Sequence, residues 1–62
     1  MKLENAYRII YKRYDKVYGK NYLNIYQGFG IGTTKGNARI DFYKQMEDQN
    51  MRGIRIVDTI KL

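Results

Sequence analysis

The apolar residues near the start of the chain recur with the spacing of a helix. On a helical wheel of 100° per residue they fall within an arc of about 120°. The members of this stripe are Leu3, Tyr7, Ile10, Tyr11, Tyr14, Val17 and Tyr18. The pattern predicts an amphipathic helix from near Lys2 to Tyr18, and Gly19 suits the left-handed conformation with which many helices end. A helix that continues through Gly19 to Tyr26 is the alternative, since one internal glycine costs only about 1 kcal/mol.

Beyond Gly19 the apolar period changes to two, which is the period of a β-strand. The alternating apolar residues are Leu23, Ile25, Phe29 and Ile31. Gly28, Gly30 and Gly32 share the opposite face, where the missing side chains would let a neighbouring helix or a ligand backbone approach closely. Residues 33–37 have turn chemistry and alternation resumes over residues 38–43, so we expect a hairpin. Residues 54–62 predict a further strand.

The fold that these segments predict is α+β, with one N-terminal helix packed on a three-stranded antiparallel β-meander. The alternative is a winged-helix-like arrangement with a second helix at residues 38–49, a segment that ends in several good helix formers. On a helical wheel Ile40 would lie roughly opposite Ala38 and Phe42, and this favours the strand. Residues 1–62 are predicted to form a single small basic domain.

The composition restricts the chemistry that the chain can perform. Its 62 residues include no cysteine and no histidine, which excludes disulfides, thiol or histidine catalysis and the usual structural zinc sites. Asp41, Glu47, Asp48 and Asp58 could place carboxylates near one another for a magnesium ion. Surface solubility and turn formation explain Glu47 and Asp48 without such a site. We therefore expect a protein that is not an enzyme and that holds neither a cofactor nor a metal ion.

The charge of the chain predicts an anionic partner. Twelve Lys and Arg residues oppose six Asp and Glu residues, for a net charge of +6. On the predicted helix most cations follow one another at i, i+4 steps opposite the apolar stripe. They are Arg8, Lys12, Arg13, Lys16 and Lys20. Like charges at this spacing repel by a few tenths of a kcal/mol per pair, so a bound phosphate backbone or acidic surface would relieve a real cost.

Three tyrosines are candidates for contact with bases: Tyr22, Tyr26 and Tyr43. Aromatic rings beside cations suit stacking on single-stranded bases, and ordinary cross-strand packing is the alternative. The run Gly28-Phe29-Gly30 resembles the Gly-aromatic-Gly core of an RNA-recognition sheet motif. Gln27, Gly32 and Thr34 depart from that motif, so we assign Phe29 to the core instead.

The function that these features predict is a small non-enzymatic nucleic-acid-binding protein or regulator, with DNA and RNA left open. The alternative is a protein-interaction module, such as a phage-borne inhibitor or an accessory subunit, that binds an acidic protein surface. We also expect a homodimer that shares the glycine strip and residues 54–62. The proline-free chain is rich in Lys, Asn, Ile and Tyr, which suggests a low-GC bacterium, its phages or its plasmids. With no membrane span or signal sequence in view, a cytoplasmic location is expected.

Overall fold

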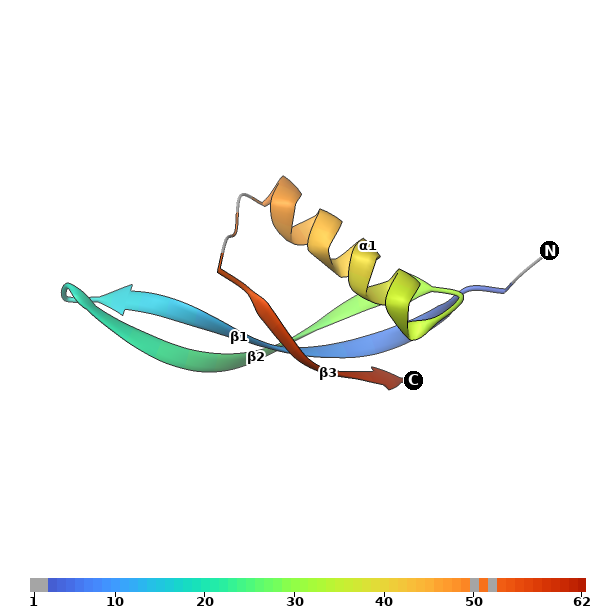
Figure 1. Ribbon diagram of the computed structural model, residues 1–62, viewed down its shortest axis with the longest axis horizontal. Helices are drawn as coiled ribbons and strands as arrows, with labels where there is room; N and C mark the ends of the chain where they lie inside the picture. The colour runs from blue at the N-terminus through green and yellow to red at the C-terminus, as the bar shows by residue number, and fades with distance from the viewer. Residues whose placement is uncertain (1–2, 50, 52) are drawn as a thin grey trace.

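The fold is a three-stranded antiparallel sheet with one helix on one of its faces (Figure 1). The computed structural model describes residues 3–49, 51 and 53–62. In chain order the elements are β1 (Asn5–Val17), β2 (Lys20–Gly32), α1 (Lys35–Asp48) and β3 (Arg55–Lys61). The strand order is β2-β1-β3, so the first strand is central and β3 reaches it after the chain has passed through α1. The protein is a small α+β domain of two layers.

The predicted N-terminal helix is wrong, because residues 5–17 form a β-strand. Tyr7, Ile9 and Tyr11 are buried in strict alternation, and Ile9, which is not part of the apolar stripe of the predicted helix, is 0 % exposed. β-branched and aromatic residues favour strands, and pairing on both edges of β1 decides the matter. The predicted start of the helix at Lys2 lies outside the described residues.

The predicted meander is also wrong, because residues 38–43 belong to α1 and not to a strand. The side-chain hydroxyl of Thr34 caps the helix by accepting a hydrogen bond from the backbone N–H of Asn37 at 3.2 Å. The alternative prediction placed a helix at residues 38–49 within a winged-helix arrangement; the observed helix spans Lys35–Asp48, and the winged-helix arrangement is absent from the described chain. Ile40 lies on the exposed side of α1, so its position opposite Ala38 and Phe42 on a helical wheel is compatible with a helix.

The strands β1 and β2 are joined by a two-residue turn at Tyr18 and Gly19. Both residues have positive φ, 51° and 78°, which is the requirement of the type I′ turn that suits the twist of a hairpin. The left-handed Gly19 that the sequence suggests is therefore present, but it turns a hairpin instead of ending a helix. Since β3 pairs with β1 only from Tyr7 to Lys12, residues 13–24 project as a two-stranded ribbon, here called the hairpin arm (Figure 1).

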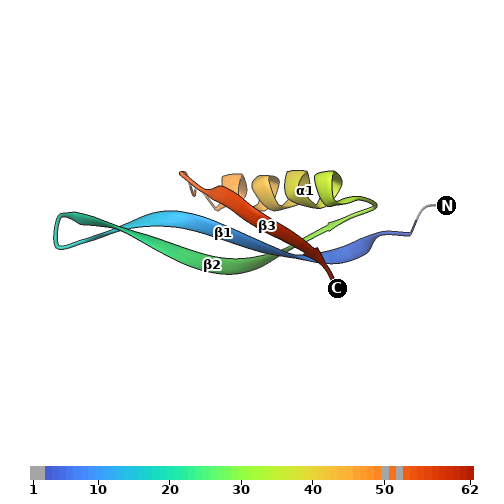
Figure 2. The same cartoon turned by 60° about the horizontal axis from the view of Figure 1, so that its bottom comes forward.

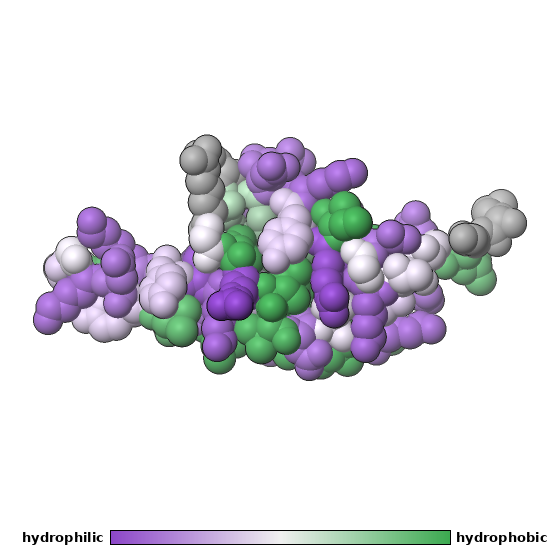
Figure 3. Space-filling view, viewed as in Figure 1, coloured by the Kyte–Doolittle hydropathy of each residue, from purple (hydrophilic) through white to green (hydrophobic). Residues whose placement is uncertain are grey.

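The core lies between α1 and the sheet. It contains Ala38, Phe42 and Met46 of α1, and Tyr7, Ile9 and Tyr11 of β1. The glycine face of β2 lets the helix approach, as expected, but the helix is α1: a Cβ at Gly28 would lie 2.6 Å from the Phe42 ring. A Cβ at Gly30 would collide with the carbonyl oxygen of Ala38. The glycine strip is therefore covered within the chain. Apolar side chains also reach the surface over the body of the molecule, between hydrophilic ones (Figure 3).

Candidate functional site

The face of the sheet opposite α1 carries no other element of the described chain (Figure 2). Because side chains alternate along a strand, the residues of β1 on this open face are Ala6, Arg8, Ile10, Lys12, Tyr14 and Lys16. Their partners on β2 are Ile31, Phe29, Gln27, Ile25, Leu23 and Asn21. The assignment of Phe29 to the core is thus wrong, since Phe29 is 56 % exposed. On β2 the open face therefore presents a mostly apolar row, next to the open-face side chains of the central strand β1.

The central strand carries a row of cations on this open face. Arg8, Lys12 and Lys16 follow one another at every fourth residue, about 13 Å apart along an extended chain. Arg55 of β3 pairs with Lys12 and adds a fourth cation. β1 and β2 are described in full, and their open-face positions include no carboxylate. We call Arg8, Lys12, Lys16 and Arg55 the basic row.

One acidic residue of β3 lies beside the basic row. Asp58 pairs with Ile10, between the positions of Arg8 and Lys12. Its Oδ1 accepts a hydrogen bond from the backbone N–H of Thr59 at 2.8 Å, next to the register shift in the β1–β3 ladder. The carboxylate therefore has a structural partner at the bulge. Even with Asp58 counted, the row retains an excess of positive charge.

Aromatic and aliphatic side chains flank the basic row. Phe29 is the cross-strand neighbour of Arg8, and Tyr14, which is 65 % exposed, follows Lys12 on the same face. A shallow hollow of about 310 Å³ joins the two kinds of residue. Its lining consists of Lys12, Tyr14, Leu23, Gly53, Arg55, Ile56 and Val57. Cations and an exposed ring around one hollow can hold a flat, anionic group from two sides.

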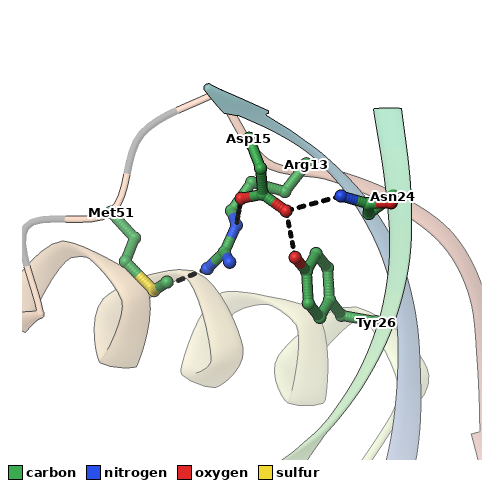
Figure 4. A network of polar contacts seen from close by, with 5 residues as sticks. All are labelled: Arg13, Asp15, Asn24, Tyr26 and Met51. Atoms are coloured by element: carbon green, nitrogen blue, oxygen red, sulfur yellow. Dashed lines mark hydrogen bonds and ion pairs between the residues drawn. The ribbon is translucent and has the colours of Figure 1, made fainter. Parts of the chain in front are cut away.

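Arg13 is turned to the other face of the hairpin and is already paired. Its Nε donates to Oδ1 of Asp15 at 2.8 Å, and its guanidinium lies 4.3 Å from the centre of the Tyr26 ring (Figure 4). Asp15 also accepts hydrogen bonds from the Tyr26 hydroxyl and, at 2.8 Å, from Nδ2 of Asn24. These contacts lower the pKa of the Asp15 carboxyl. The hydrogen bond from Tyr26 has the largest effect, followed by those from Asn24 and the Arg13 guanidinium. This cluster joins β1 to β2 at the base of the hairpin arm.

The structure divides the eight predicted binding residues among three surfaces. Arg8, Lys12 and Lys16 share the open face; Arg13, Lys20, Tyr22 and Tyr26 lie on the opposite face of the hairpin; and Tyr43 lies on α1. Tyr14, Phe29 and Arg55 were not predicted as surface residues of one site. A period of two read from Tyr7 onward would have placed Tyr14 with the cations, but the pairing of Arg55 with Lys12 depends on the strand order.

No family model, curated protein or solved structure matches the chain. Within the described residues, no helix has the length and apolar character needed to cross a membrane, and no cluster of acidic residues is suited to a metal ion. The site is therefore characterised by its geometry, and that geometry is a basic row on an open, partly aromatic sheet face.

Proposed function

We propose that the protein is a non-enzymatic nucleic-acid-binding protein that holds a phosphate backbone along the open face of its sheet. The observation that carries the proposal is the basic row: three cations on one face of the central strand, with no carboxylate at the open-face positions of β1 and β2. The net charge of +6 supports the same kind of partner. Release of counterions from a polyanion would supply the binding free energy.

The exposed rings favour single strands as the ligand. Phe29 lies beside Arg8, and Tyr14 lies beside Lys12 and the hollow, so a strand whose phosphates follow β1 would place unpaired bases near both rings. Stacking on such rings contributes about 1–3 kcal/mol per base and tolerates any base. A duplex keeps its bases stacked inside and would use only the cations.

The salt dependence of binding tests this proposal. Fluorescence anisotropy with labelled single-stranded and duplex DNA and RNA, over about 50–200 mM salt, should give a slope of log K against log salt near −0.7 per phosphate contact for single strands. The variant Arg8→Gln/Lys12→Gln/Lys16→Gln should reduce that slope by about two units. The matched control is Lys35→Gln/Lys44→Gln/Lys61→Gln, which removes three cations elsewhere. Each variant has a net charge of +3, since three of the twelve cations are lost.

The two variants separate a specific site from general attraction to a polyanion. If both lose affinity equally, the net charge and not the basic row holds the nucleic acid. If the parent shows no salt-dependent binding to any of these ligands, the proposed function is wrong.

A protein partner is the second candidate, and the apolar row of β2 favours it. Leu23, Ile25 and Ile31 are about half exposed or more, and aliphatic side chains do not stack on bases. An acidic protein surface with an apolar centre could contact both this row and the cations. The protein would then act as a phage-borne inhibitor or as an accessory subunit. A parent protein that fails to bind nucleic acid would direct the search to such a partner.

A further inference from the structure

The two edges of the sheet are protected to very different degrees. The edge strand β3 has charged residues at Arg55, Asp58 and Lys61 within its seven residues. The other edge strand, β2, has thirteen residues, and none of them after Lys20 is charged. Edge strands in monomeric proteins usually carry charges that prevent pairing with another chain. The long, neutral edge of β2 is therefore the one suited to pairing.

Side chains of α1 cover one end of this edge. The backbone N–H of Ile31 donates to Oδ2 of Asp41 at 2.9 Å, and Nε2 of Gln45 donates to the carbonyl oxygen of Phe29 at 3.3 Å. Gln45 also donates to Asp41 at 2.9 Å, which ties the two caps together. The stretch from Lys20 to Gly28 has no comparable side-chain cap among the described residues. We call this stretch the free edge.

The direction of the backbone groups on the free edge follows from the cap at Ile31. Its N–H points away from β1, and no register shift interrupts the β1–β2 ladder. In an antiparallel ladder alternate residues point the same way, so four residues of the free edge turn their N–H and C=O outward. They are Asn21, Leu23, Ile25 and Gln27. These groups can bond to water or to another strand.

We propose that the free edge pairs with the free edge of a second copy of this chain, in antiparallel register about a two-fold axis. A pairing that uses the whole stretch from Lys20 to Gly28 is centred on Asn24. It forms about eight backbone hydrogen bonds from the four outward-facing residues of each copy. The pairing ends where the caps of α1 begin and where the turn of the partner subunit begins, so it closes as a dimer.

The side chains of the free edge are complementary to themselves in this register. On the open face Leu23 lies opposite Ile25 of the partner subunit, and both positions are at least half exposed in one chain. On the other face Tyr22 lies opposite Tyr26 of the partner subunit, which is an aromatic cross-strand pair. Apolar contacts therefore line both sides of the new ladder.

Electrostatic repulsion favours this arrangement over other dimers. Each chain has a net charge of +6, so two copies repel. Pairing through β2 keeps the two basic rows three strand spacings apart, about 14 Å, which exceeds the Debye length of about 8–10 Å at moderate salt. Packing two open faces together would bring the rows into contact. The cations thus direct the chains to meet at their neutral edges.

Cysteine crosslinking tests the register directly, because the chain has no cysteine of its own. In the proposed dimer Asn24 faces its own copy in a non-hydrogen-bonded pair, with Cα atoms about 4.5 Å apart, a distance that a disulfide spans. Asn24→Cys should form a disulfide-linked dimer under mild oxidation. The control Gln27→Cys lies about 20 Å from its own copy and should crosslink at least tenfold more slowly. Equal crosslinking of the two variants would overturn the register.

Sedimentation without nucleic acid tests the dimer itself, so that its failure leaves the proposed function standing. The parent should sediment at twice its 7.4 kDa mass at high micromolar concentration. Ile25→Lys should weaken association at least tenfold, because it adds charge at the centre of the free edge. Ile31→Lys adds the same charge to the same row at the capped end and should leave association unchanged. A monomeric parent, or a dimer broken by Ile31→Lys and not by Ile25→Lys, would refute the proposal.

Discussion

At the scale of single residues, the contact between sheet and helix depends on positions that lack a side chain. Gly28 and Gly30 place the backbone of β2 directly beneath Phe42 and Ala38, so the helix lies closer to the sheet than side chains would allow. Ile9 and Phe42 are both buried in the core between this helix and the sheet. A close approach of this kind transmits small changes of volume to the backbone itself.

Gly30→Ala should therefore lower the free energy of unfolding by about 1–3 kcal/mol or more, because its Cβ meets the backbone of Ala38 and not a flexible side chain. Gly36→Ala is the matched control within α1, where the nearest atom to the new Cβ is 3.8 Å away. That substitution should raise stability by less than about 1 kcal/mol, because Gly36 lies in the first turn and the full helix-propensity gain applies to the helix interior. Urea denaturation measures both, and a neutral Gly30→Ala would contradict the packing described.

The cluster at Asp15 predicts a pH dependence. The hydrogen bond from the Tyr26 hydroxyl, then those from Asn24 and Arg13, lower the pKa of this carboxyl in the folded state. Its contribution to stability is therefore complete above the unfolded value of about 3.9 and is lost as pH falls through the folded value. Asp15→Asn should be less stable than the parent at neutral pH, and the two melting temperatures should converge in acid. Glu47→Gln controls for the loss of one negative charge.

At the scale of elements, the helix predicted in place of β1 was wrong because a spacing of four residues fits two structures. Tyr7 and Tyr11 share a face on a helix, where four residues exceed one turn slightly, and also on a strand, where four is twice the period. Ile9 distinguishes the two structures, and its burial is set by pairing on both edges of β1. Because a spacing of four fits both structures, the prediction that Arg8, Lys12 and Lys16 share one face did not depend on the choice between helix and strand.

The glycine strip was predictable as a place of close approach, by a helix or by a ligand backbone, because the absence of side chains is a property of the sequence. Which helix lies there was not predictable. Ala38, Phe42 and Met46 recur at i, i+4 and form the buried side of α1, while exposed Ile40 concealed that pattern. The pairing of Arg55 with Lys12 also had no local signal, since it depends on β3 crossing to the central strand.

The turn at Tyr18 and Gly19 predicts opposite effects of two substitutions on the stability of the hairpin. Tyr18 is 100 % exposed and has a φ of 51°, a conformation that asparagine tolerates better than a bulky aromatic residue. Tyr18→Asn should therefore raise the free energy of unfolding by up to about 1 kcal/mol. Gly19→Ala should lower it by about 1–2 kcal/mol, because its φ is 78°. Equal effects of the two changes on thermal unfolding would argue against the type I′ turn.

At the scale of the whole molecule, the fold separates a packed body from an extended arm. The dimensions are 49 × 21 × 12 Å, and the hairpin arm accounts for much of the length while α1 and β3 cover only the base of the hairpin (Figure 1). A single chain thus has a long ribbon with free backbone groups at its outer edge. In the proposed dimer the two ribbons support one another, and the sheet becomes continuous across both copies.

Hydrogen exchange distinguishes the single chain from the dimer at individual amides. The N–H of Leu23 and Ile25 point outward, so they should exchange quickly in dilute protein and slowly in concentrated protein. The N–H of Asn24 points toward β1 and should depend far less on concentration. NMR exchange at two protein concentrations measures all three, and uniform behaviour of neighbouring amides would count against pairing through this edge.

The position of β1 between β2 and β3 also has a consequence for synthesis on the ribosome. When β1 and β2 have been made, they form a hairpin with no covered face, and a two-stranded hairpin is marginally stable in water. α1 then covers one face. The edge of β1 that faces away from β2 has no partner until residues 55–61 are translated, after β1, β2 and α1. A nascent chain stopped before β3 should therefore remain sensitive to protease, and resistance should appear in one step when β3 joins the sheet.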